Sequence, residues 1–436
     1  VSGVTAGTFF SCAILTALFL RSRTRMEHNL KTCILPFWTR YMTDQVHGGF
    51  YGRVDGSLQP DLSSPKSMVL NGRMLWTYSR AWDMVRYPAC QELAQRAFRY
   101  IQSHFWDELS GGVYWAVTCR GEPSELEKRT YAQAFLIYSY AEYYRVFGSK
   151  EALDRARQVL SLLNRHMKYP QGGYADSAAR DWLRDDWINF WVKNRTGAAK
   201  LLNSNMHLFE AIYNLAQAAP EPWILQSLRD ELEFLLGTVV DRKLHHLKAA
   251  MDVSGARLDH EINYGHDAEC SYLLTGAAEL LGDADLIRRA RETAVDLMDH
   301  VLAEGMDPEY GGLYYIGDSA SGEINRAKIW WVQAEGITAS FNCYQFTGDR
   351  RYLDAAVNIW NYVERYVVNH DLGEWYSVGL PPCDDTELRA QADQLKEVFN
   401  NNELAGKGKC PYHNSRTCFE IMRRADVILS PAGACP

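Results

Sequence analysis

A short glycine-containing turn recurs along this chain at a nearly constant spacing, and this repeat constrains the fold more than any other feature. The distance from Gly48 to Gly111 is 63 residues, and that from Gly111 to Gly172 is 61. Gly311 and Gly373 are 62 residues apart, whereas 139 residues, about two periods, separate Gly172 from Gly311. A fixed period of this kind indicates one structural unit repeated in space. The five visible copies, each with aromatic residues beside the glycine, lie at residues 47–51, 111–115, 172–174, 311–315 and 373–376.

Between these turns, apolar residues recur at three- and four-residue spacing, which is typical of amphipathic helices. A sixth turn is expected near residues 241–252, so that every period holds two helices. This pattern predicts an all-α fold, a single (α/α)6 barrel of six helical hairpins with an inner ring of helices inside an outer ring. An open helical solenoid is the alternative, but it would not need aromatic turns gathered at one end. The expected helices span residues 27–42, 68–86, 90–105, 131–147, 151–168, 203–218, 222–239, 267–281, 284–303, 328–346, 351–369 and 414–427, with a further one around 385–400.

The first 25 residues differ in character from the rest of the chain. An apolar run from Val4 to Leu20 is followed by three arginines within five residues. A signal peptide would carry its positive charge before the apolar run and a small-residue cleavage site after it. We therefore interpret residues 1–25 as an appended or leader-like segment outside the fold, with a signal anchor as the alternative. Residues 26–436 show no linker or change in composition, so we expect them to form one catalytic domain without a membrane span.

Charge and cysteine content exclude some classes of partner. The 436-residue chain has a net charge of −8 and no basic cluster within the folded part, which disfavours binding to nucleic acid. Its ten cysteines are scattered and form no C-x-x-C pair, a pattern typical of reduced thiols in a cytoplasmic protein without a structural zinc site. Whether the protein is a monomer or a homodimer stays open at this stage.

Three histidines at the starts of predicted inner helices are the strongest candidates for chemistry. His266 is followed three residues later by Glu269, and His207 is followed at the same spacing by Glu210. Residues three apart share a helix face, so a carboxylate can orient an imidazole and raise its basicity. His413 lies where a proline-containing loop enters the last helix. Each alone also fits a buried histidine near a helix N-terminus, but in a ring of hairpins all three converge on one end of the barrel axis.

Several other side chains occupy the same phase of the repeat. Arg73 offers a rigid fork of donors suited to a carbonyl or enediolate oxygen, although a surface ion pair is an equal alternative. Tyr131 opens another inner helix and can donate to a sugar hydroxyl or simply pack. Trp331 and Glu335 share one helix face, where a tryptophan is either a core residue or a platform for a sugar ring.

Six dispersed motifs together resemble the N-acylglucosamine 2-epimerase superfamily, and within it most closely the cellobiose 2-epimerases. The resemblance covers nearly all of residues 26–427, in order and at the right spacing. The motifs are NGRMLW at 71–76, TYAQAF at 130–135, MHLFEA at 206–211, YGHDAE at 264–269, WWVQAE at 330–335 and KCPYHNSR at 409–416.

The resemblance implies an (α/α)6 barrel that epimerises C2 of a reducing-end aldose through ring opening and a cis-enediolate, without a metal or organic cofactor. It implies that His266 and His413 are the two acid/base residues, with Glu269 as the carboxylate partner of His266. It further implies that His207 and Arg73 polarise the substrate oxygens. Sugar-pocket positions implied by the resemblance are Tyr131, Asn203, Trp331 and Glu335.

Two departures from the family pattern bear on the substrate. Disaccharide-specific members resemble one another in a tryptophan just before K-C-P-Y-H, where this chain has Gly408, so Trp375 or Trp331 would have to compensate. The segment before His207 is closer to that of monosaccharide-acting members. We expect an enzyme of the isomerase class, a sugar 2-epimerase acting on a β-1,4-linked disaccharide such as cellobiose or mannobiose. The alternative is a 2-epimerase for free or N-acylated monosaccharides, or an aldose–ketose isomerase.

Two other function classes remain. A glycoside hydrolase needs two carboxylates at the reacting bond, for which Glu269 and Glu335 could be proposed, but three convergent histidines are unexpected there. A non-catalytic sugar-binding module would need the aromatic residues but not the histidine pair.

Overall fold

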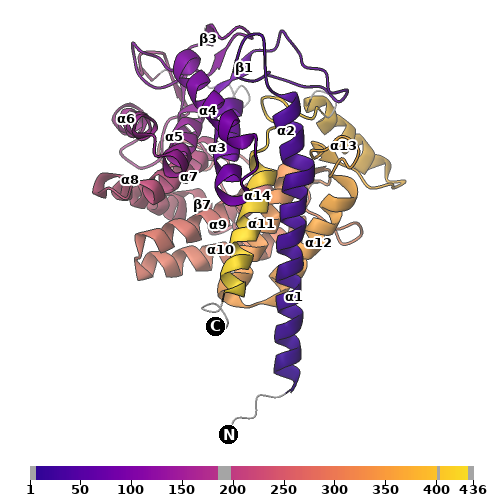
Figure 1. Ribbon diagram of the computed structural model, residues 1–436. Coiled ribbons are helices and arrows are strands. Elements are labelled where there is room, and N and C mark those ends of the chain that lie inside the picture. The colour runs from indigo at the N-terminus through magenta and orange to yellow at the C-terminus, as the bar shows by residue number, and fades with distance from the viewer. Residues whose placement is uncertain (1–5, 185–197, 400–402, 431–436) are drawn as a thin grey trace.

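The structure is a computed structural model that describes residues 6–184, 198–399 and 403–430, with side chains from residue 16 onward. Among these residues, six helices form an inner ring in which each contacts the next and the last contacts the first. This closure confirms the predicted barrel and excludes an open solenoid (Figure 1). The inner helices are α3 (Met68–Val85), α5 (Thr130–Phe147), α7 (Leu202–Ala218), α9 (Tyr264–Leu281), α11 (Trp330–Thr347) and α14 (Tyr412–Leu429).

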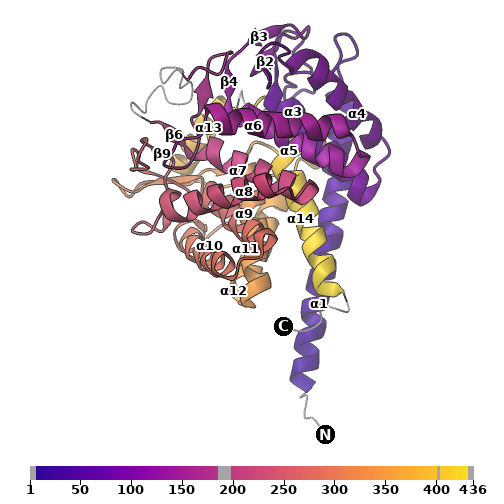
Figure 2. The ribbon, with the colours of Figure 1, turned by 90° about the vertical axis from the view of Figure 1, so that its left-hand side faces the viewer.

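An outer ring covers the inner one, and consecutive hairpins stack side by side from α5 to α12 (Figure 2). The sixth pair joins the two ends of the described chain, because α1 packs against α14. The outer elements are α1, η1 and α2 (Ala6–Asn29, Leu30–Ile34, Leu35–Tyr41), α4 and η2 (Cys90–Tyr100, Ile101–Phe105), α6 (Lys150–His166), α8 and η4 (Pro222–Phe234, Leu235–Val239), α10 (Ala284–Gly305) and α12 (Arg350–Tyr366), and α13 (Thr386–Val398) is an additional helix after them.

A tight turn follows each outer helix in the described part of the chain, including the sixth turn predicted near residues 241–252. An Asp or Asn usually opens the turn. Its side chain accepts hydrogen bonds from the backbone N–H groups two and three residues further along the chain. Asp107, for example, accepts from Leu109 and Ser110 and also binds the buried Lys128 at 2.9 Å. The bridges that close the turns are 43–50, 106–113, 168–174, 240–247, 306–313 and 368–375.

Short antiparallel strands connect these turns to the starts of the inner helices. A strand after one turn pairs with the strand that leads into the preceding inner helix, so the inner N-termini are gathered at the same end of the barrel axis as the turns. The pairs are β1–β2, β4–β5, β6–β9, β10–β11 and β13–β14. The strands are β1 (Lys66–Ser67), β2 (Ala116–Val117), β3 (Pro123–Glu125), β4 (Lys128–Arg129), β5 (Ser177–Ala178), β6 (Lys200–Leu201), β7 (Val240–Asp241), β8 (His246–Leu247), β9 (Ala250–Met251), β10 (Glu261–Asn263), β11 (Ile316–Asp318), β12 (Ile324–Asn325), β13 (Lys328–Ile329) and β14 (Val378–Gly379).

The N-terminal helix α1 continues through Met26 without a break and lies beside α14 (Figure 1). Phe19 is 2% exposed, and its ring lies 6.1 Å from that of Phe341 on α11. Arg23 donates to Asp426 of α14 at 2.6 Å. Residues 19–25 therefore contact the barrel, which the predicted boundary at residue 26 did not include. In the described residues, no helix combines the length and apolar character needed to cross a membrane.

Candidate active site

A cavity of about 590 Å³ lies where the first turns of the inner helices converge. Its wall is made by side chains from all six inner helices, together with the strands and loops that lead into them. Eight of the residues predicted from the sequence line it: Arg73, Tyr131, Asn203, His207, His266, Glu269, Trp331 and His413. The convergence expected from the phase of the repeat is therefore observed.

Two predicted residues do not line this cavity. Glu335 is fully buried beneath it and contacts His413 from below. Trp375 is fully buried elsewhere, with its indole N–H donating to Asn29 at 3.0 Å and its ring 6.2 Å from that of Trp360. The prediction that Trp375 contacts sugar is thus corrected: it occupies the turn position that faces the core in every repeat. The equivalent core residues are Phe50, Val113, Tyr174, Leu247 and Leu313.

The floor of the cavity is a buried charge network centred on Arg416. Its guanidinium donates to Glu210 and Glu269, and to Glu335 at 2.7 Å. Burial and the neighbouring Glu335 raise the pKa of Glu269 to about 7. Burial also opposes ionisation of Glu210, but Arg416 and His207 outweigh it and hold the pKa of that carboxyl at about 2. One guanidinium among three carboxylates thus leaves Glu269 as the group that titrates near neutral pH.

His413 is oriented by Glu335. The Nδ1 atom of His413 lies 2.6 Å from Glu335 Oε1, while Tyr272 donates to Oε2 of the same carboxylate at 2.7 Å. Because Arg416 has only donors and bonds to the same Oε1 atom, this oxygen accepts, and His413 Nδ1 carries the proton. Burial, Arg73 and Arg416 lower the pKa of His413 well below its usual 6.5. The imidazole is therefore neutral at pH 7, and its Nε2 lone pair is free to accept a proton.

His266 and His413 both contact the ring of Trp331. The Trp331 ring centroid is 5.0 Å from that of His266 and 5.6 Å from that of His413. The backbone N–H of His266 donates to Asn263, which caps α9. The predicted pairing of His266 with Glu269 is corrected, because the Glu269 carboxylate bonds to Arg416 instead. Glu269 is one helical turn deeper, where Arg416 lies within reach.

His207 and Arg73 supply fixed polar groups at the cavity wall. His207 Nδ1 lies 3.0 Å from Glu210 Oε2, so here the predicted i, i+3 pair does form. Arg73 donates to the Tyr131 hydroxyl at 2.8 Å and to Cys410 Sγ at 3.2 Å. Its guanidinium stays protonated, whereas burial raises the pKa of Tyr131 to about 12 and keeps that hydroxyl a neutral donor.

Sequence reasoning missed the central role of Arg416, although a signal for it was present. Each site histidine is followed three residues later by a charged residue, and these are Glu210, Glu269 and Arg416. Arg416 bonds to both glutamates one turn below the imidazoles. The same observation bears on metal binding: the carboxylates and imidazoles lie close enough together to hold an ion, but Arg416 already serves as their cation. Other lining residues not foreseen are Trp115, Tyr315, Phe399 and Lys407.

Comparison with known proteins agrees with this geometry. The family model for N-acylglucosamine 2-epimerase (GlcNAc 2-epimerase) matches residues 48–380. A cellobiose 2-epimerase from Bacteroides fragilis is 33% identical over 398 residues, which are 91% of this chain and 97% of the relative. The crystal structure of a sugar epimerase from a ruminal bacterium superposes with a TM-score of 0.84 at 30% identity, covering 92% of this chain and 98% of that one.

A more distant likeness concerns the fold alone. The crystal structure of a D-mannose isomerase superposes with a TM-score of 0.76 at 20% identity, covering 92% of this chain and 97% of that one. The decisive likeness is the family match, which spans most of the barrel together with the cavity-forming helices α3 to α11. The chain is therefore an epimerase of the isomerase class and belongs to the N-acylglucosamine 2-epimerase family.

Proposed function

We propose that this protein is a sugar 2-epimerase that inverts C2 of the reducing-end aldose of a β-1,4-linked disaccharide such as cellobiose or mannobiose. The observation that carries the proposal is that two imidazoles, those of His266 and His413, line one cavity and both contact the Trp331 ring. Inversion of C2 requires a proton to leave one face and arrive on the other, so it needs two acid/base groups. Several curated relatives, including the one from Bacteroides fragilis, are cellobiose 2-epimerases.

The first step is removal of the C2 proton from the open-chain aldose. The C2–H electron pair moves into a C1–C2 double bond, and negative charge develops on the carbonyl oxygen, giving a cis-enediolate. His413 suits the role of base because it is neutral, with Nδ1–H held by Glu335 and Nε2 unprotonated. Arg73 and His207 lie on the same wall and would stabilise the developing charge.

The second step returns a proton to C2 from the opposite face. We assign this step to His266 in one direction of the reaction. The two epimers carry the C2 hydrogen on opposite faces, so in the reverse direction His266 is the base and His413 the acid. Trp331, which contacts both imidazoles at the cavity wall, provides a flat surface against which the planar enediolate can lie.

A monosaccharide or N-acylhexosamine 2-epimerase, or an aldose–ketose isomerase, is the second candidate function. The observation that favours it is the open space at Gly408: among the described residues, a β-carbon there would meet only Phe399, at 4.0 Å. The second sugar of a disaccharide would therefore have no aromatic ring at position 408 to stack on. An aldose–ketose isomerase would form the same enediolate and would differ from an epimerase only in returning the proton to C1 instead of C2.

Glycoside hydrolysis fits the geometry poorly. Glu269 and Glu335, the two carboxylates that could be proposed, both accept from the same Arg416, and Glu335 lies below the cavity wall. A hydrolase needs one carboxyl as acid and the other as base or nucleophile on either side of the scissile bond.

Proton NMR of the purified chain with cellobiose in D₂O, with EDTA present, tests the proposal. Appearance of 4-O-glucosyl-mannose with deuterium at C2 is the expected result. Release of glucose would identify a hydrolase instead. If cellobiose is unchanged while mannose, glucose or N-acetylmannosamine is converted, the disaccharide assignment fails and the second candidate replaces it.

A further inference from the structure

The fourth turn in chain order, closed by the pairing of residues 240 and 247, differs from the other five in the described chain. His245 adopts a positive φ of 58°, whereas the equivalent positions in the other turns are glycines with φ between 70° and 85°. The left-handed region is unfavourable for a residue with a β-carbon, and such residues persist where the surroundings hold them in place. The equivalent glycines are Gly48, Gly111, Gly172, Gly311 and Gly373.

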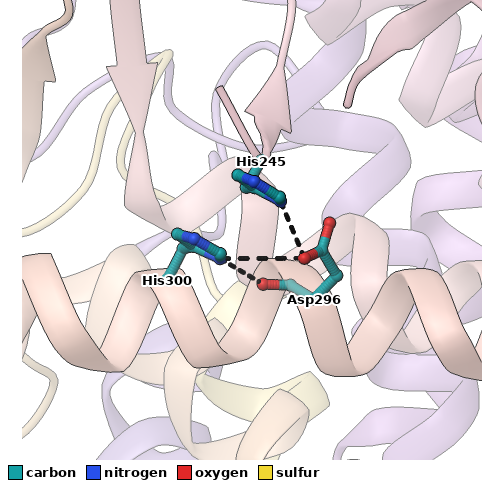
Figure 3. Close-up of side chains that lie close together, drawn as sticks. All are labelled: His245, Asp296 and His300. Atoms are coloured by element: carbon teal, nitrogen blue, oxygen red, sulfur yellow. Dashed lines mark hydrogen bonds and ion pairs between the residues drawn. The ribbon is translucent and has the colours of Figure 1, made fainter. Parts of the chain in front are cut away.

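The neighbouring outer helix differs at the same place. In the second, third and fifth turns that helix packs so closely that a β-carbon on the glycine would lie 2.6–3.0 Å from a side-chain atom. At the fourth turn, α10 instead presents Asp296 and His300, and the imidazole of His245 occupies the space between turn and helix (Figure 3). Both changes, one on the turn and one on the helix, bring metal-ligand side chains together.

The three side chains are arranged around one carboxylate oxygen. His245 Nδ1 lies 2.8 Å from Asp296 Oδ1, and His300 Nδ1 lies 3.8 Å from the same oxygen (Figure 3). The two imidazoles are stacked, with ring centroids 4.1 Å apart and planes 3° from parallel. His300 Nδ1 also lies 2.9 Å from the backbone carbonyl oxygen of Asp296, so both Nδ1 atoms carry hydrogens that they donate to oxygens of Asp296.

These distances suit a tetrahedral transition-metal ion. Ligands about 2.0–2.1 Å from zinc lie roughly 3.3 Å from one another. The observed 2.8 and 3.8 Å bracket that separation, and the three ligand atoms all lie within 4.8 Å of one another. An ion would replace the hydrogens on the two Nδ1 atoms. Both rings would also have to turn out of their parallel stack, because the lone pair of each nitrogen lies in the plane of its own ring. Two imidazole nitrogens and one carboxylate oxygen form a donor set that zinc and similar divalent ions prefer over calcium or magnesium. All three side chains are partly exposed, which leaves an entry path and a position for water.

We propose that His245, Asp296 and His300 form a binding site for a divalent transition-metal ion of the zinc type. The site is on the outer ring, away from the cavity described above, and none of its residues lines that cavity. An ion there would fasten the fourth turn to α10. The backbone of the next residue continues into β8, and the side chain of His246 binds Asp267 of α9 at 2.7 Å, so the ion would stiffen the support of the helix that carries His266. We therefore expect bound metal to raise thermal stability without being required for turnover.

Isothermal titration of the EDTA-stripped full-length chain with Zn²⁺ tests the site. We expect one equivalent to bind with a micromolar or lower Kd, and Co²⁺ to give visible absorption of a tetrahedral complex. His245→Gly and His300→Asn should each weaken Zn²⁺ binding by at least about tenfold, since each removes one of three protein ligands. His370→Asn, an exposed histidine on another turn, is the matched control and should bind as the unchanged protein does.

One further variant, His413→Asn, and one stability measurement make the result decisive. His245→Gly restores the residue found in the other turns, so it should fold well and lose the Zn²⁺-dependent rise in Tm. If Zn²⁺ binding instead survives His245→Gly and His300→Asn, or disappears in His413→Asn, the ion binds elsewhere and the proposal is overturned. Epimerase activity in EDTA, measured for His245→Gly, separates this proposal from the function of the cavity: the expected result is no loss.

Discussion

The two ends of the barrel axis offer cavities of similar size but opposite chemistry. The cavity at the N-terminal ends of the inner helices is about 590 Å³ and contains three histidines and Trp331. The one at the C-terminal ends is about 490 Å³ and contains arginines and glutamates, among them Arg80, Arg423 and Glu420. Arg416 and Glu210 belong to the wall of the second cavity and, through Glu269, to the floor of the first, so they form the partition.

The difference between the two cavities shows that proton transfer depends on which side chains line a cavity and not on the presence of a cavity alone. At the C-terminal end, burial opposes ionisation of Glu420, but Arg423 and Arg424 outweigh it and hold the pKa of that carboxyl at about 2. A carboxylate paired with arginines keeps one protonation state near pH 7 and cannot exchange protons. At the N-terminal end, the neutral imidazole of His413 can accept a proton, and the pKa of Glu269 is about 7. The same helices thus present a reactive end and an inert one.

Removing either imidazole at the reactive end should give the largest effect. His266→Asn and His413→Asn are each expected to lower kcat by roughly 10²–10⁴-fold, because the residue that exchanges the C2 proton on one face is lost. Steady-state kinetics measure the loss, and sugar binding by calorimetry should remain. His370→Asn, on the outer surface, serves as the control. Full turnover in either variant would remove that histidine from the mechanism.

Removing Arg416, which lies between the two cavities, should strongly destabilise the protein. Arg416→Met leaves three buried carboxylates without their cation, which should lower the free energy of unfolding by about 3–5 kcal/mol. Chemical denaturation measures this change. Arg423→Met, whose side chain is half-exposed at the opposite end, should cost far less. Equal losses in the two variants would contradict the central role assigned to Arg416.

The pH dependence of stability should report on Glu269. Its folded pKa is about 7, above the value of about 4.3 in an unfolded chain. The folded state therefore binds more protons between these values, and the free energy of unfolding falls as pH rises through this window, by up to about 4 kcal/mol. Glu269→Gln should abolish this fall. Glu279→Gln on the same helix, where the side chain is exposed, should keep it. An unchanged pH profile in Glu269→Gln would place the titration elsewhere.

A change at the inert end should have the smallest effect. Arg80 donates a long hydrogen bond of 3.4 Å to Glu142, and its side chain is partly exposed. Arg80→Gln should lower the free energy of unfolding by less than about 1 kcal/mol and leave kcat/KM unchanged. A large loss of kcat/KM here would show that the two ends are coupled through Arg416, and the contrast between them would no longer hold.

Local pattern was enough to predict the barrel and the position of the site. The period of the turns and the spacing of apolar residues indicated two helices per repeat, and six repeats close a ring. The fourth turn in chain order was predicted although its glycines are replaced by His245 and His246, because the spacing of the other five turns required it. His207, His266 and His413 were correctly expected to converge, since each opens an inner helix and the strand pairs bring those helix starts to one end.

Which side chain pairs with which was decided only by the tertiary structure. The i, i+3 rule treats His207–Glu210 and His266–Glu269 alike, yet only the first forms a hydrogen bond between its two side chains. Glu269 is drawn instead to Arg416, 147 residues away, and Arg416 reaches Glu210 across 206 residues. Trp375 has an aromatic ring that could stack on a sugar, but its side chain is buried in the core. Sequence periodicity fixes which face of a helix a residue occupies, whereas the depth and the partners on that face depend on neighbouring helices that are distant in the chain.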